Sequence, residues 1–298
     1  MNIVRSAIFL VQLSVFLTVC SVGLRATVAD AVWLLRHPGL LLRSLLAMNV
    51  LMPVFAVILA AKSELYPAVK VALVFLAVSP VPPVLPRAQS RLGGSSPYIC
   101  GLLVSTALLS IVVVPLTIEL VGRFFGRGLQ SGPATVAKVM ATSVLLPLAL
   151  GMLIRRVAPG LAKRTSAPLG GIALFFLVAS AAVLFIVALP SIAQLIGNGT
   201  VIAIAVFVLA GTAMGHLLGG PEPANRATLA LATASRHPGL AVALASADFP
   251  AQKEVIAAAV LLYLVVKAVT LIPYNSWQRH RLGLSGRQKS AEPRHHTA

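Results

Sequence analysis

Charged residues are scarce in this chain: only 10% of its 298 residues are Asp, Glu, Lys or Arg, against a hydrophobic fraction of 58%. A soluble protein of this length needs far more polar surface to cover its core, so the scarcity excludes one and predicts a polytopic integral membrane protein. Acidic residues are scarcer still, with 7 Asp and Glu against 24 Lys and Arg. The basic excess lies mainly in loops and the C-terminal tail, where it sets topology and meets anionic headgroups. We therefore expect a lipid bilayer as partner and no nucleic acid.

Cysteine and catalytic motifs are also lacking. The 2 cysteines, Cys20 and Cys100, both lie in apolar runs, so neither a disulfide framework nor a cysteine-based metal site is indicated. No glycine-rich nucleotide-binding loop, GxSxG or HExxH motif occurs in the sequence. We therefore expect neither an enzyme nor a resident cofactor, and no pump driven by its own ATPase domain.

Apolar stretches recur along nearly the whole chain, each bounded by Gly, Pro or charge. Spans of about 20 residues with short connections predict an all-α fold of about nine transmembrane helices. They lie at about 7–22, 39–61, 65–94, 98–121, 134–154, 169–189, 200–218, 228–249 and 255–273. A cleaved signal peptide is the alternative for the first. We expect a single transmembrane domain at residues 1–276 and a basic, disordered cytoplasmic tail at 277–298.

The span from Thr228 to Phe249 is apolar enough for membrane depth, yet its middle is polar. It carries Thr233, Ser235, Arg236 and His237, followed by Pro238 and Gly239. Proline removes a backbone donor and glycine frees the backbone, so a continuous helix is excluded. In a bilayer, a guanidinium and freed backbone groups are tolerated only where they face protein or a water-filled cavity. An interrupted segment of this kind is typical of a transporter binding site.

A second interruption is predicted in the third span, where four prolines lie close together. Pro80, Pro82, Pro83 and Pro86 cannot belong to one continuous helix, although an ordinary proline-rich loop is an equal alternative. The two interrupted segments are the third and eighth spans, five apart, which is typical of inverted-repeat transporters. The first repeat then covers about 7–121 and the second about 134–274. The pentapeptide RHPGL at Arg36 and again at Arg236 falls at non-equivalent places in them.

The basic clusters predict the orientation. Placing the C-terminal tail in the cytoplasm also places there the residues of 25–43, 87–91, 155–164 and Arg226, leaving fewer basic residues on the other face. We therefore expect the N-terminus outside, the C-terminus inside and a bacterial inner membrane.

With these segments placed, the chain resembles the bile acid:sodium symporter family over nearly its full length. The resemblance rests on Thr27 and Asp30 before RHPGLLLRSLL, on LMPVFAVILA around Pro53, on Ser79-Pro80 and above all on NRATLALATASRHPGLAVALA at 225–245. It implies a core domain with two broken, crossing helices and a panel domain that rocks against it. It also implies sodium-driven import of organic anions.

The sequence departs from the family at its sodium site. It has Met48, Leu85, Pro86 and Ala232 where the family has Gln, Ser, Asn and Glu. Arg236 and His237 stand in place of the Gln and Asn at the crossing. Sodium needs several oxygen ligands, and a guanidinium would repel it, by about 4 kcal/mol at 4 Å for an effective dielectric near 20. The departures argue against sodium coupling and against any metal at these positions.

Each candidate site residue has two interpretations. Arg236 substitutes for the missing cation, binds a substrate carboxylate, or does both. His237 carries a proton or bonds a freed carbonyl. Thr233 and Ser235 face the cavity or bond their own helix. Asn49 lines the substrate cavity or bonds across helices, and Lys267 has a partner at membrane depth or snorkels.

The sequence thus predicts a secondary transporter of an organic anion, bile-acid-like or a small carboxylate, that works by alternating access. One alternative is a proton-coupled or uncoupled carrier, and another is a non-transporting scaffold or sensor with the same fold. The sequence leaves substrate and oligomeric state open.

Overall fold

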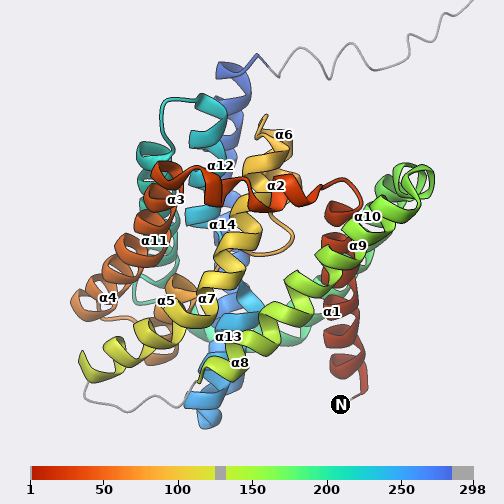
Figure 1. Cartoon of the computed structure of the whole chain (residues 1–298). Coiled ribbons are helices and arrows are strands. Elements are labelled where there is room, and N and C mark those ends of the chain that lie inside the picture. The colour runs from red at the N-terminus through yellow and green to blue at the C-terminus, as the bar shows by residue number, and fades with distance from the viewer. Residues whose placement is uncertain (1, 125–131, 284–298) are drawn as a thin grey trace, which may run out of the picture.

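A computed structural model describes residues 2–124 and 132–283, and every regular element in that part of the chain is helical (Figure 1). Seven helices there are long and apolar enough to cross a membrane. Four are single elements: α1 (Asn2–Gly23), α7 (Ser96–Phe124), α10 (Pro159–Leu195) and α11 (Thr200–Leu218). Two contain a π-helical turn: α3–η2–α4 (Pro38–Leu45, Leu46–Leu51, Met52–Lys62) and α8–η3–α9 (Pro133–Met140, Ala141–Leu145, Leu146–Val157). The seventh is η4–α14 (Pro250–Gln252, Lys253–Arg281).

The third and eighth predicted spans are pairs of short helices instead. The third consists of α5 (Pro67–Val78) and α6 (Pro86–Arg91), and the eighth of α12 (Pro223–Ala234) and α13 (Pro238–Asp248). Two further short elements, α2 (Val28–Val32) and η1 (Leu34–Arg36), join α1 to α3. The prediction of an all-α membrane protein is confirmed, and both predicted interruptions are present as non-helical backbone.

The C-terminal helix extends further than the sequence predicted. α14 runs through Trp277 to Arg281, five residues into the segment predicted as a disordered tail (277–281). Residues 284–298 lie outside the described part of the chain.

Prolines determine where many of these helices begin. A proline is the first residue of each of α3, α5, α6, α8, α10, α12 and α13. Its fixed φ suits the first helical turn, and its missing N–H is not needed there. Other prolines lie inside the long helices: Pro53, Pro115, Pro147, Pro168, Pro190 and Pro273. Among them, Pro53 and Pro147 each lie two residues after the end of a π-helical turn, η2 and η3 respectively.

The helices pack as two groups. In the first group α1 lies along α9 and α10 (Figure 1). In the second group α5 contacts α4, α13 and α14, and α11 lies along α12. In the first group α1 and α9 approach closely at Gly23 and Gly151, where a side chain on either would overlap the backbone of the other helix. The main hydrophobic core lies mostly in the second group, and α7, α8 and the C-terminal part of α10 also contribute to it. Large apolar side chains face outward on both, as on Phe9, Val112, Phe175 and Ile202, which suits a lipid environment.

Candidate functional site at the crossing of the interrupted helices

The two non-helical breaks meet inside the second group. The backbone N–H of His237 donates to the carbonyl of Pro80, 3.0 Å away, and so joins the break after α12 to the break after α5. Residues 80–83, together with Leu85 and Pro86, are buried. This segment is therefore an internal crossing and not an exposed proline-rich loop.

Arg236 lies at the centre of this crossing and is fully buried. Its Nη1 donates to the carbonyl of Ser79 at 3.2 Å, and its Nη2 donates to the carbonyl of Met48 at 2.8 Å. Its Nε has no hydrogen-bond acceptor in the described structure. Ser79 caps the C-terminal end of α5, where carbonyls carry the negative end of the helix dipole. The guanidinium thus occupies a position that favours a cation.

The Met48 carbonyl is available because of Pro53. In η2 the backbone N–H of Met52 donates to Ala47, five residues earlier. The Met48 carbonyl would correspondingly need the N–H of residue 53, and proline has none. The proline-induced π turn therefore leaves an acceptor that Arg236 uses.

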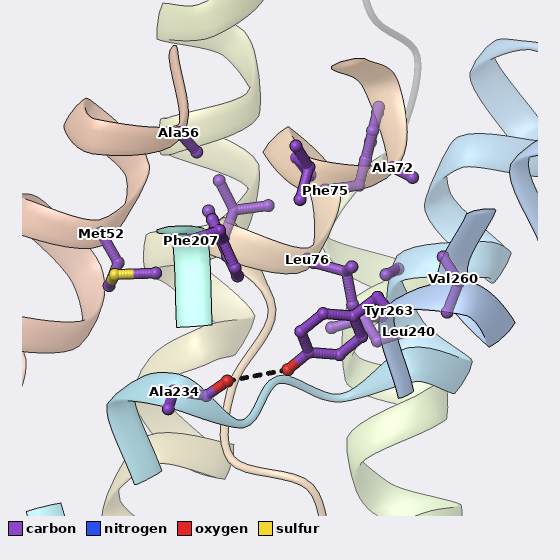
Figure 2. Close-up of a cluster of buried hydrophobic side chains, with 14 of the residues drawn as sticks. Met52, Ala56, Ala72, Phe75, Leu76, Phe207, Ala234, Leu240, Val260 and Tyr263 are labelled. Atoms are coloured by element: carbon purple, nitrogen blue, oxygen red, sulfur yellow. Dashed lines mark hydrogen bonds between the residues drawn. The ribbon is translucent and has the colours of Figure 1, made fainter. Parts of the chain in front are cut away.

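Tyr263 of α14 stabilises the non-helical backbone between α12 and α13, which carries Arg236. Its hydroxyl donates to the carbonyl of Ala234, the last residue of α12, at 2.9 Å and accepts from the backbone N–H of Arg236 at 3.0 Å. Figure 2 shows this buried ring among apolar side chains, with its oxygen directed at the chain that leaves α12. One hydroxyl therefore satisfies two backbone groups freed by the break.

His237 points from the crossing towards the first helix group. Its Nδ1 accepts from the backbone N–H of Leu240 at 3.2 Å and so caps α13. Its Nε2 lies 3.4 Å from the hydroxyl of Ser143 in η3. Because Nδ1 accepts a hydrogen bond, the ring proton is on Nε2 and the imidazole is neutral in this arrangement.

The remaining predicted residues are placed around this centre. Thr233 is buried, and its hydroxyl donates to the carbonyl of Leu229 in its own helix at 2.8 Å. Ser235 is buried at the C-cap of α12, and Asn49 is half-buried in η2 beside Met48. The Lys267 ammonium lies 5.5 Å from the centre of the Tyr263 ring. Pro238 and Gly239 are the first two residues of α13.

The positions at which the sequence departs from the sodium site that the resemblance implies are buried, and their side chains carry no oxygen. They are Met48, Leu85, Pro86 and Ala232. No cluster of three His, Cys, Asp or Glu residues suited to a metal ion occurs in the described residues.

Three site residues were not singled out from the sequence: Tyr263, Ser143 and Gln89. Gln89 of α6 is buried and donates to the carbonyl of Thr228 in α12 at 2.9 Å, a second bond between the interrupted segments. A polar side chain inside an apolar span was the available signal for Tyr263 and Ser143, but their partners lie far away in sequence.

Comparison with protein families agrees with this architecture. The model of the sodium bile acid symporter family matches residues 12–195, more than half of the chain. A comparison with curated proteins returned no match.

Proposed function

The chain belongs to the sodium bile acid symporter family of membrane transporters, and from that membership and the geometry at Arg236 we propose that it carries an organic anion across the membrane without sodium. The substrate class is a bile-acid-like molecule or a small carboxylate, and the mechanism is alternating access. The family consists of transporters and not enzymes, in agreement with the absence of catalytic motifs.

The proposed architecture has nine crossings, in which each pair of short helices forms one. The two pairs then hold corresponding places in two inverted repeats. In Figure 1 the N-terminal end of α1 and the C-terminal end of α14 lie at opposite ends of the bundle, as an odd number of crossings requires. With the basic loops inside, the N-terminus is outside and the C-terminus is in the cytoplasm of a bacterial cell.

The observation that carries the proposal is the position of the Arg236 guanidinium. It is fully buried and bonds the carbonyls of Ser79 and Met48, the kind of oxygen that would otherwise attract a metal cation. A sodium ion within 4 Å would be repelled by about 4 kcal/mol at an effective dielectric near 20. Arg236 therefore acts as a permanent, covalently attached cation, and transport has no need of a dissociable one.

His237 does not supply a proton in place of sodium. Adding a proton to Nδ1 would break its bond to the Leu240 N–H, uncap α13 and place a second positive charge next to Arg236. These costs oppose protonation within the transport cycle. The carrier is accordingly uncoupled from protons at this residue.

The substrate anion binds between the crossing and η3. Arg236 provides the positive charge on one side, and Ser143, half-buried and bonded to the imidazole of His237, lies on the other. η3 belongs to the α8–η3–α9 helix, whose α9 lies against α1 and α10. Movement of this first group relative to the crossing would open the site alternately to each side, with the Ser143–His237 contact made and broken in each cycle.

The test is uptake by proteoliposomes that contain the purified protein. The starting panel of labelled anions is taurocholate, pyruvate and pantoate, with protein-free liposomes as the blank. We expect saturable uptake of at least one anion, and its loss in Arg236→Gln, which removes the charge but keeps a polar side chain. Arg164→Gln is the matched control, because Arg164 is exposed.

A carrier in which Arg164→Gln lost as much uptake as Arg236→Gln would contradict the role of the crossing. A protein that bound these anions in equilibrium dialysis but moved none of them would be the scaffold or sensor of the alternative interpretation.

A further inference from the structure

A second cationic site lies away from the crossing, where α6 meets the first helix group. Arg87 of α6 is half-buried, and its guanidinium lies directly over Gly170 of α10. A methyl group added to Gly170 would overlap the Arg87 Nη2, and it would lie 3.0 Å from the hydroxyl oxygen of Ser21 on α1. Glycine at 170 thus creates the notch that holds Arg87 between two elements of the first group.

No negative group neutralises Arg87 within the described residues. Its guanidinium has no hydrogen-bond acceptor or carboxylate partner there, and the salt bridge between Arg123 and Glu119 is elsewhere on α7. The Ser21 hydroxyl donates to the carbonyl of Thr18. Two like charges, those of Arg25 and Arg91, lie within electrostatic reach of Arg87.

A fourth arginine extends the cluster. Arg155 of α9 donates from Nη1 to the carbonyl of Arg25, in the loop between α1 and α2. Asp30 is the acidic residue nearest in sequence to Arg25, and its carboxylate is engaged by the backbone N–H and the hydroxyl of Thr27, both at 2.7 Å. Arginines from three segments of the chain, α6, α9 and the loop after α1, therefore lie close to one another, and a bound anion would offset their mutual repulsion.

The geometry points to a binding site for the phosphate headgroup of an acidic phospholipid, formed by Arg25, Arg87, Arg91 and Arg155 around Gly170. Arg25 and Arg91 are exposed, and all four arginines lie at helix ends or in the loop beside α1, the level at which headgroups meet a membrane protein. Basic pockets between transmembrane helices are typical sites for acidic headgroups. Arginine also offers phosphate a bidentate match that a lysine cannot.

The site joins the two helix groups, since Arg87 belongs to α6, whereas Arg155 and Gly170 belong to α9 and α10. A phosphate held there would tie these groups together at one membrane face. The inference does not depend on the proposed transport function, because it rests on different residues and is tested by binding.

The test is native mass spectrometry of the purified full chain, released from detergent with either phosphatidylglycerol or the zwitterionic phosphatidylethanolamine. We expect retention of phosphatidylglycerol in preference to phosphatidylethanolamine. Arg87→Gln should weaken phosphatidylglycerol binding roughly fivefold, the effect of one arginine–headgroup contact. Gly170→Val should weaken it similarly, because it fills the notch while every charge remains.

Two variants serve as matched controls. Arg36→Gln removes an exposed arginine of η1. Gly171→Val adds a valine side chain at the residue after Gly170, where nothing lies within 4 Å of the added Cβ. Neither should change lipid retention, and circular dichroism establishes that all four variants are folded. An equal loss in Arg36→Gln would indicate diffuse surface attraction and overturn the site, as would unchanged binding in Arg87→Gln.

A further arm distinguishes a lipid headgroup from a soluble anion. Thermal unfolding in lipid-free detergent is compared in sodium phosphate and in sodium chloride of equal ionic strength. We expect no stabilisation by phosphate that depends on Arg87. Stabilisation that disappears in Arg87→Gln would assign the site to a soluble anion and refute the lipid.

Discussion

His37 and His237 belong to two copies of the same pentapeptide, and each stands immediately before a helix that begins with proline. Both histidines hold the N-cap position, but only His237 caps its helix with its side chain, whereas Nδ1 of His37 lies 2.8 Å from the carbonyl oxygen of Trp33. The surroundings differ too, because Arg36 is the exposed last residue of η1 whereas Arg236 is fully buried. The apolar residues that flank the second copy take its arginine into the bundle, where freed carbonyls are its acceptors. Sequence context, and not the motif, makes Arg236 a candidate site residue.

At the residue scale, the Tyr263→Phe variant tests whether the Tyr263 hydroxyl stabilises the non-helical segment between α12 and α13. Removing the hydroxyl leaves the Ala234 carbonyl and the Arg236 N–H without their partner in a buried place. Such unmade bonds cost about 1–3 kcal/mol each, so we expect a clearly lower midpoint of thermal unfolding in detergent. Tyr66→Phe is the matched control, since Tyr66 is only half-buried and makes no hydrogen bond through its hydroxyl within the described residues. Equal midpoints for the two variants would refute this role.

Arg236 and His237 could be predicted as site residues because charge inside an apolar segment is a strong signal. Ser143 and Tyr263 could not, because their importance depends on partners 94 and 27 residues away that only the fold brings close. The role of the Met48 carbonyl is harder still to predict from the sequence, since its availability depends on backbone geometry and not on the side chain.

At the scale of elements, two features of helices build the site: breaks and π turns. The breaks could be predicted, since proline and glycine cannot continue a helix. The π turns η2 and η3 could not, because Pro53 and Pro147 allow either a kink or a π turn and tertiary packing selects between them. Both turns lie against the crossing, η2 at Arg236 and η3 at His237.

Gly215 of α11 allows this helix to pack closely against α12. A side chain at Gly215 would come within 2.5 Å of the Leu229 carbonyl oxygen and 2.6 Å of the Ala230 Cα, both backbone atoms that cannot move aside. We expect Gly215→Val to lower the unfolding midpoint or prevent folding, because small residues allow such close helix contacts. Gly171→Val, on the open face of α10, should leave the midpoint within error. A tolerated Gly215→Val would contradict the observed packing of α11 on α12.

The crossing also predicts how sodium sensitivity could be gained. The double variant Ala232→Glu with Arg236→Gln replaces the fixed cation with carboxylate and amide oxygens, which suit a sodium ion. We expect sodium chloride, relative to choline chloride, to raise the unfolding midpoint of the double variant, because ligands that bind the folded state stabilise it. Wild-type protein should not respond. A sodium response in wild type as large as in the double variant would contradict the account.

At the scale of the whole molecule, the asymmetry of basic residues predicts orientation. The tail and the loops with Arg25–Arg43, Arg87/Arg91 and Arg155–Arg164 should be cytoplasmic. A fluorescent protein that matures only in the cytoplasm should therefore fluoresce when fused to the C-terminus. The same fusion in the loop after Lys62 should be dark, and an exported alkaline phosphatase there should be active. The reverse pattern would invert the topology.

In this member of a transporter family two helix groups pack around one crossing, and the central part of the proposed function is that Arg236 replaces the dissociable cation. The most direct test measures initial uptake by proteoliposomes of an anion found to be transported, with an inward gradient of sodium or of choline at equal ionic strength. We expect equal uptake rates in the two gradients, and loss of both in Arg236→Gln. Uptake that accelerates with the sodium gradient in wild type would contradict it, because sodium would then bind despite the guanidinium in its place.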